Sequence, residues 1–123
     1  TDLALEEAAE SLEYPMHRVD LATVTYKEGF LDAISKALSF PDWFGHNWDA
    51  LADCLNDLSW MPADGYVIVL EHADAFAAAS PTDFATALSI LQDAADSWRE
   101  EGIPLWTLVG TRSDGIAWLQ DIE

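Results

Sequence analysis

Apolar residues recur every three or four positions in the middle of the chain, at Trp48, Leu51, Leu55 and Leu58. At about 100° per residue these side chains share one face of a helix, and such a stripe has to be buried. Asn47 stands directly before the stripe and is a residue type that caps the first turn of a helix. The pattern therefore predicts a helix from Trp48 to about Leu58, with Asn47 as its N-cap.

A second helix is predicted upstream of this one. Residues 25–28 (TYKE) have the T-x-x-E pattern of a capping box, so the helix should run from about Tyr26 to Leu38. The residues expected on its buried face are Phe30, Ile34 and either Leu38 or Ala37. Pro41 closes this segment, and Gly45 in the following turn is expected to supply a backbone conformation that other residues resist.

The longest predicted helix lies in the C-terminal half. Residues 80–83 (SPTD) supply an N-cap, a Pro at the first helical position and an acid in the first turn. The apolar pattern continues to about Glu101, where Gly102 and Pro104 favour an end. The side chains that this helix is predicted to bury are Phe84, Leu88, Leu91, Ala95 and Trp98.

Three short segments have the character of strands. The first covers residues 16–23, and the second, residues 66–70 (YVIVL), is an unbroken apolar run after a turn at Asp64-Gly65. Residues 105–109 (LWTLV) are the third. The order strand, two helices, strand, helix, strand predicts a single α/β domain, with a small three-stranded parallel sheet packed with helices.

This domain is predicted to occupy residues 16–110. Residues 1–15 form an N-terminal extension, in which residues 2–13 favour either a short amphipathic helix or a loose arm. As a helix, the segment would place Leu5, Ala9 and Leu12 on one side. Residues 111–123 form a C-terminal extension that is expected to pack on the domain.

The charge of the chain narrows its possible partners. Five Lys plus Arg against 23 Asp plus Glu give a formal net charge of −18. Such a chain repels phosphate, which argues against direct binding of nucleic acid or of an anionic membrane, and it attracts a basic partner. Composition alone fits an ordinary solvated surface equally well. However, residues 37–98 hold ten acids and no Lys or Arg, whereas solvated surfaces usually mix the two signs.

Three of these acids form a row on the predicted central helix. Asp49, Asp53 and Asp57 recur every fourth residue, on the side away from the apolar stripe. Like charges at this spacing destabilise a helix by about 0.2–0.5 kcal/mol per pair. The nearest bases in the sequence are Lys36 and Arg99. The row therefore indicates a counter-charge outside the helix.

Cys54 is the only cysteine, so the chain cannot form an internal disulfide, and a cytoplasmic location is expected. Because this residue lies beside the apolar stripe, a structural core thiol is favoured over a reactive one. No apolar run approaches the length of a membrane span. Trp43 lies in a polar turn, where its ring either plugs the start of the helix or stands out as an interface anchor.

Sequence features of an enzyme are missing. Glycine-rich phosphate loops and the G-x-S-x-G motif do not occur, and three outward acids on an open helix do not make a cleft. No catalytic role and no cofactor are therefore expected. A less favoured alternative is a metal-binding module, in which His46, Asp49 and Asp53 assemble a carboxylate-rich site for a hard cation.

The central stretch also matches a known pattern, namely Pro, two aromatics, Gly, a polar residue, Asn, an apolar residue, Asp-Ala-Leu, any residue and Asp-Cys-Leu. The residues that meet it are Pro41, Trp43, Phe44, Gly45, Asn47, Trp48, Asp49, Ala50, Leu51, Asp53, Cys54 and Leu55. This stretch resembles the barstar family, the intracellular inhibitors of barnase-type ribonucleases. The order of predicted strands and helices from about residue 16 to residue 109 agrees with that resemblance.

The resemblance implies that the central helix and the loop before it plug the active site of a basic ribonuclease, with acids where RNA phosphates would lie. It implies partner contacts by Trp43, Gly45, Asn47, Trp48, Asp49 and Asp53. This chain departs from the family at Ala52, which replaces a Trp, and at His46, which replaces an acid. The glutamate of the later family helix falls near Ser97, with Asp96 or Asp93 as its stand-in. The predicted partner-binding set is Trp43, Gly45, His46, Asn47, Trp48, Asp49, Ala52, Asp53 and Asp96.

Two related functions use the same acidic surface. The chain could be an immunity or antitoxin protein against a toxin that is not a ribonuclease, or a nucleic-acid mimic that blocks a basic nucleic-acid-binding protein. In each case the partner is a basic protein. The free inhibitor is expected to be a monomer or a weak homo-oligomer.

Overall fold

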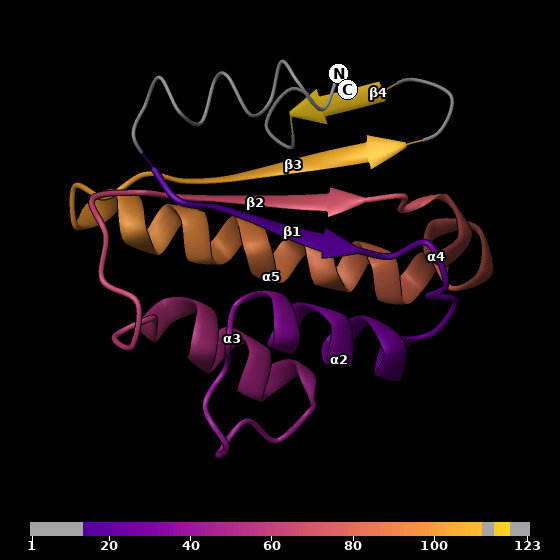
Figure 1. The fold of residues 1–123 in the computed structure, drawn as a ribbon, viewed down its shortest axis with the longest axis horizontal. Coiled ribbons are helices and arrows are strands. Elements are labelled where there is room, and N and C mark those ends of the chain that lie inside the picture. Colours follow the sequence, from indigo (N-terminus) through magenta and orange to yellow (C-terminus); the bar gives the residue numbers. More distant parts are fainter. Residues whose placement is uncertain (1–13, 112–114, 119–123) are drawn as a thin grey trace.

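The computed structural model describes residues 14–111 and 115–118 (Figure 1). Its sheet has the strand order β1-β2-β3-β4. Strands β1 (Met16–Asp20), β2 (Tyr66–Glu71) and β3 (Leu105–Thr111) run parallel to their neighbours, as predicted. Strand β4 (Gly115–Trp118) pairs antiparallel with β3 and was not predicted as a strand. The α/β class and the three-stranded parallel core are therefore confirmed, with a fourth strand added at the edge.

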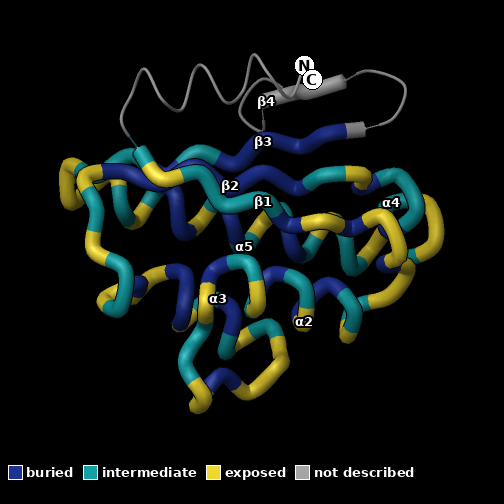
Figure 2. Tube along the Cα trace, in the orientation of Figure 1, coloured by how far each residue is buried: buried dark blue, intermediate teal, exposed yellow. Residues whose placement is uncertain are grey.

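The labelled helices lie on one side of the sheet (Figure 1). They are α2 (Lys27–Ala37), α3 (Trp48–Asp57), α4 (Asp74–Ala79) and α5 (Pro81–Glu100). Alternate residues of the strands point towards them, so Val19, Leu70 and Val109, which are paired in register, enter the same core. Figure 2 shows that the helices turn their buried positions to the sheet and their exposed positions outward.

Two predicted helix caps are not present in the structure. Helix α2 begins at Lys27, and no side chain caps it, so the predicted capping box at residues 25–28 is wrong. Ser80 precedes α5 as predicted, but its side chain makes no capping hydrogen bond to that helix. Instead, the Ser80 hydroxyl donates to the carbonyl of Thr25 at 2.8 Å. This long-range bond joins the starts of α2 and α5.

Helix α4 was not foreseen, because six residues with one fully buried side chain show no helical period. That side chain is Phe76, whose ring stacks on Phe30 with centroids 5.3 Å apart and meets Phe84 edge-on at 5.9 Å. On α5, Leu91 and Ala95 are buried as predicted, whereas Phe84, Leu88 and Trp98 are partly buried and pack against the core.

The described residues include no helix that is both long enough and apolar enough to cross a membrane. The sequence proposals for residues 1–13, namely a short amphipathic helix or a loose arm, lie outside the described residues. Of the C-terminal extension, residues 112–114 and 119–123 also lie outside them.

Candidate functional site

Helix α3 has the start that the sequence predicts. The Asn47 side chain accepts a hydrogen bond from the backbone N–H of Ala50 at 2.7 Å, so Asn47 is the N-cap. At the other end, Leu58 adopts the left-handed conformation with φ 49°, and its N–H donates to the Cys54 carbonyl at 3.1 Å. The stripe residues Leu51, Leu55 and Leu58 are buried. The start of the helix is therefore set by its own sequence, whereas its end uses a left-handed conformation that leucine rarely adopts.

We predict that Asn47→Ala lowers the free energy of unfolding by about 1 kcal/mol, because the first turn of α3 loses its capping acceptor. Asn56→Ala is the matched control, since Asn56 is exposed on the same helix and donates only to the Ala52 carbonyl one turn before it. The control should change stability by less than about 0.5 kcal/mol. Urea unfolding followed by circular dichroism measures both losses, and equal losses would contradict the assignment of the cap.

Rings from the loop before α3 and from Trp60, which follows the helix, form a cluster that we call the ring cluster: Phe40, Trp43, Phe44, His46 and Trp60. Phe40 meets Phe44 at 4.9 Å and Trp60 at 5.9 Å between centroids. The Trp60 indole N–H donates to the Leu38 carbonyl at 3.1 Å, which ties the end of α3 to the end of α2. Trp60 is not among the site residues predicted from the sequence. The loop itself is mostly exposed, at the bottom of the view in Figure 2.

Trp43 stands out from this cluster. It meets Trp60 edge-on at 6.4 Å, yet 58% of the residue is exposed. The ring is therefore exposed and does not plug the start of the helix, and its role as an interface anchor stays a prediction. An exposed indole that packs edge-on against a neighbouring ring is a common contact in protein interfaces.

The special backbone conformation in this loop belongs to His46, where Gly45 was predicted to supply it. His46 has a φ of 56°, while Gly45 has no positive φ. Gly45 has a different reason to lack a side chain, because an added Cβ would lie 3.2 Å from the Asn47 Nδ2 atom. The His46 ring packs on Phe44 at 4.6 Å between centroids, and this contact holds the turn in place.

The acidic row lies on the outer face of α3. Asp49, Asp53 and Asp57 are all exposed, as predicted. Within residues 14–111, no Lys, Arg or His forms an ion pair with any of the three, whereas Lys36 pairs with Asp32 at 3.0 Å and Arg99 with Asp96 at 2.7 Å. The described part of the chain therefore leaves this row without a counter-charge.

Asp96 differs from the acidic row. Its carboxylate accepts hydrogen bonds from Arg99 at 2.7 Å and from Gln92 at 3.0 Å, so it carries its own counter-charge on α5. Any partner cation would have to compete with Arg99 for it. The sequence-based proposal that Asp96 contacts the partner stays a prediction.

Trp48 and Ala52 are only partly exposed on α3. The Trp48 ring packs against Phe30 with centroids 6.2 Å apart, and the Lys27 ammonium lies 5.4 Å from the centre of the same ring. This cation–π contact stabilises the start of α3 against α2. No local pattern signals this contact, because the two residues are 21 positions apart.

Cys54 is fully buried on the inner face of α3, as expected for a structural thiol. Burial raises the pKa of the Cys54 thiol to about 11, and the neighbouring charges of Asp53 and Asp57 act in the same direction. Both effects disfavour the thiolate, which is the reactive form of cysteine.

We predict that Cys54 reacts with a disulfide reagent such as DTNB at pH 8 at least about a hundredfold more slowly in the folded protein than in urea. A pKa of about 11 in place of 9.0 lowers the thiolate fraction by that factor. Because the chain has one cysteine, the absorbance change reports this thiol alone. A folded-state rate close to that of the unfolded chain would show that the thiol is accessible.

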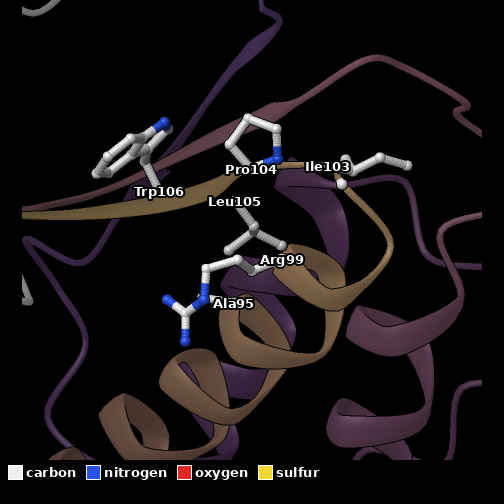
Figure 3. Close-up of a pocket in the computed structure, with 7 residues that line it drawn as sticks. Ala95, Arg99, Ile103, Pro104, Leu105 and Trp106 are labelled. Atoms are coloured by element: carbon white, nitrogen blue, oxygen red, sulfur yellow. The ribbon is translucent and has the colours of Figure 1, made fainter.

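A cavity of about 270 Å³ lies between the end of α5 and the start of β3 (Figure 3), and among the described residues that line it only Arg99 is charged. Arg99 is already paired with Asp96. In the part of the chain that the structure describes, no three His, Cys, Asp or Glu side chains come together as metal ligands, so His46, Asp49 and Asp53 do not form the alternative metal site there.

The chain that forms α3 and its loop is similar to a known family. The family model described as Barstar (barnase inhibitor) matches residues 14–110, which include β1, β2, the four described helices, all of β3 except Thr111, and the whole acidic row. The chain belongs to the barstar family. A search of the curated proteins found no match. At the level of the family, the protein is therefore an inhibitor of barnase-type ribonucleases.

Membership of the barstar family accounts for the exposed acids and the exposed indole on the surface of α3 and its loop. The family is described as barnase inhibitors, and the surface of α3 and its loop presents exposed acids and an exposed indole. The match ends at Gly110, so strand β4 lies beyond the part of the chain that the family model covers.

Proposed function

We propose that this barstar-family protein binds the active site of a basic ribonuclease through α3 and the loop before it, and blocks the entry of RNA. The acidic row carries the proposal, because Asp49, Asp53 and Asp57 are exposed together and unpaired by any described residue. Ribonuclease active sites hold cationic side chains that bind phosphate. Carboxylates on a preformed helix can satisfy the same cations by charge-assisted hydrogen bonds.

The rigidity of the surface supports this mode of binding. The Asn47 cap sets the first turn of α3, and the Trp98 indole N–H donates to the Leu55 carbonyl at 2.7 Å, which fixes the helix against α5. Little conformational freedom is therefore lost when the acids meet a partner. Trp43, exposed in the loop before α3, adds an apolar contact that excludes water from the interface.

The net charge of −18 extends the attraction beyond contact distance. Such a field speeds the encounter with a basic protein by about 10- to 1000-fold at low salt. Salt should remove this gain, because the Debye length falls from about 30 Å at 0.01 M to about 3 Å at 1 M. The dissociation rate depends on contacts within the interface and should respond much less.

The test is inhibition of a purified basic ribonuclease of the barnase type, with surface plasmon resonance across that salt range. We expect stoichiometric inhibition and an association rate that falls steeply with salt. A control ribonuclease of similar size with an acidic surface should bind far more weakly. Absence of binding to any basic barnase-type ribonuclease would overturn the proposal.

The same surface could instead act on a basic toxin of another kind. His46 and Ala52 favour this second possibility, because both depart from the family pattern within the contact region. Affinity capture with the purified inhibitor as bait distinguishes the two. A captured partner with ribonuclease activity supports the first proposal, and a basic partner without it supports the second.

A further inference from the structure

The turn after α3 brings Trp60 back to the loop before that helix. Helix α3 ends at Leu58 in the left-handed conformation, and the Met61 backbone N–H donates to the Leu58 carbonyl at 3.1 Å. The indole N–H of Trp60, within this turn, donates to the carbonyl of Leu38, the C-cap of α2. A residue that follows α3 is therefore fixed to the end of the helix that precedes it.

Trp60 lies between the core and the exposed ring of Trp43. It is partly buried and packs against the core between the sheet and the helices, and its ring meets Phe40 edge-on. The same ring meets Trp43 edge-on at 6.4 Å between centroids, and among the described residues this is the aromatic contact that Trp43 makes. A tryptophan that is 58% exposed has most of its surface in water, so apart from Trp60 it has little packing to restrain its rotamer.

The backbone around these rings adopts conformations that residues other than glycine rarely adopt. Ser39, His46 and Leu58 have φ values of 55°, 56° and 49°. They lie next to Phe40, before the N-cap of α3 and at the end of α3, so they border the ring cluster. Such conformations persist where the surrounding structure over-determines them, and they gather at sites that need a fixed geometry. They support a loop and a turn that are held in one arrangement.

We propose that Trp60 is a positioning residue, which holds the Trp43 indole in the orientation in which it contacts the ribonuclease. This role rests on the proposed function, in which Trp43 supplies an apolar contact at the interface. A side chain that is ordered before binding loses less rotamer freedom when the partner arrives, so affinity rises without a further contact. Trp60 itself then needs no contact with the ribonuclease.

A double-mutant cycle on affinity for a basic barnase-type ribonuclease tests this role. Trp60→Leu should weaken binding by about 2- to 12-fold, which corresponds to the cost of ordering one side chain on binding. In the Trp43→Ala background the same substitution should change affinity by less than about twofold, because the ring that it positions is gone. Trp60→Phe keeps an aromatic ring beside Trp43 and should restore most of the affinity, although it lacks the indole N–H.

Trp98→Leu is the matched control. Trp98 is also a partly buried tryptophan whose indole N–H donates to a backbone carbonyl, that of Leu55, but its ring meets Tyr66 and not Trp43. Its removal should therefore alter affinity by the same factor, to within about twofold, with and without Trp43. If the losses from Trp60→Leu and Trp98→Leu both depended on Trp43, they would report a general loosening of the fold and overturn the proposal.

A second measurement uses the free protein and needs no ribonuclease. Relaxation of ¹⁵N nuclei resolves each indole N–H separately, so it gives an order parameter for Trp43 alone. We expect about 0.85 in the wild type, as for a rigid group, and less than about 0.6 in Trp60→Leu. A wild-type value below about 0.6, which does not depend on how any variant folds, would overturn the proposal, and so would equal values in the two proteins.

The two proposals fail in different ways. If the wild-type chain binds no basic barnase-type ribonuclease, the proposed function is overturned, whatever the order parameter of Trp43. If the wild type binds but the losses from Trp43→Ala and Trp60→Leu simply add, the interface stands and the positioning role of Trp60 is overturned.

Discussion

Asp53→Ala is expected to weaken binding of the basic ribonuclease by about 30- to 3000-fold. Asp53 lies at the centre of the acidic row, where a partner would remove water from both charges of the pair. Truncating one side of such a pair leaves the partner's cation buried and unpaired, which costs about 2–5 kcal/mol, and each 1.4 kcal/mol is tenfold in affinity. This range is a general one, from charge pairs in protein complexes that include members of this family.

Asp57→Ala is the matched control for this prediction. Asp57 is equally exposed and lies one turn further along α3, at the end of the helix, where a contact is expected at the wet rim of the interface. Charge pairs at a rim contribute about 0–1 kcal/mol, so affinity should fall by less than about tenfold. Isothermal titration calorimetry measures both losses. Equal losses would show that Asp53 does not hold the central position.

Phe30→Ala is expected to lower the free energy of unfolding by about 3–5 kcal/mol. Phe30 is fully buried between α2, α3 and α4, with Phe76 stacked on its ring at 5.3 Å and Trp48 at 6.2 Å. Its removal would leave a cavity under the start of α3. Because most domains are stable by about 5–15 kcal/mol, this loss would be visible as a lower urea midpoint.

Tyr26→Ala provides the comparison for Phe30→Ala. Tyr26 is also aromatic and adjoins α2, but 58% of it is exposed. Its loss should cost less than about 1 kcal/mol. If both variants unfolded at the same urea concentration, the aromatic contacts of Phe30 would not be the source of its stabilising effect.

The elements that the sequence predicts well are those that depend on near neighbours. Helix α3 has its cap three residues from the amide that it binds, and β2 is a continuous apolar run. The failures involve distant partners. The Ser80 hydroxyl donates to the Thr25 backbone carbonyl across 55 positions, so Ser80 does not cap α5 as the local pattern predicts. Strand β4 is four residues long and is defined by its pairing with β3.

The features of the candidate site also separate into those that follow from local spacing and those that depend on distant partners. Outward placement of the acidic row follows from its four-residue spacing, which the structure retains. The Lys27 contact with Trp48 and the support of Trp43 by Trp60 join separate segments, and no local pattern signals them. The Asp96–Arg99 pair is a different case. Its three-residue spacing is visible in the sequence and is compatible with an ion pair within α5. The resemblance to the family instead implied that Asp96 is an interface acid.

Helix α3 ends at Asp57 and has no basic residue in its last turn. The carbonyl end of a helix carries a partial negative charge, so a carboxylate there opposes the dipole of its own helix, while a lysine would stabilise it. The free inhibitor thus carries a local instability that a cationic ligand would relieve. By thermodynamic linkage, a saturating ligand should raise the melting temperature of this protein, and a thermal-shift screen of basic proteins could find its target without an activity assay.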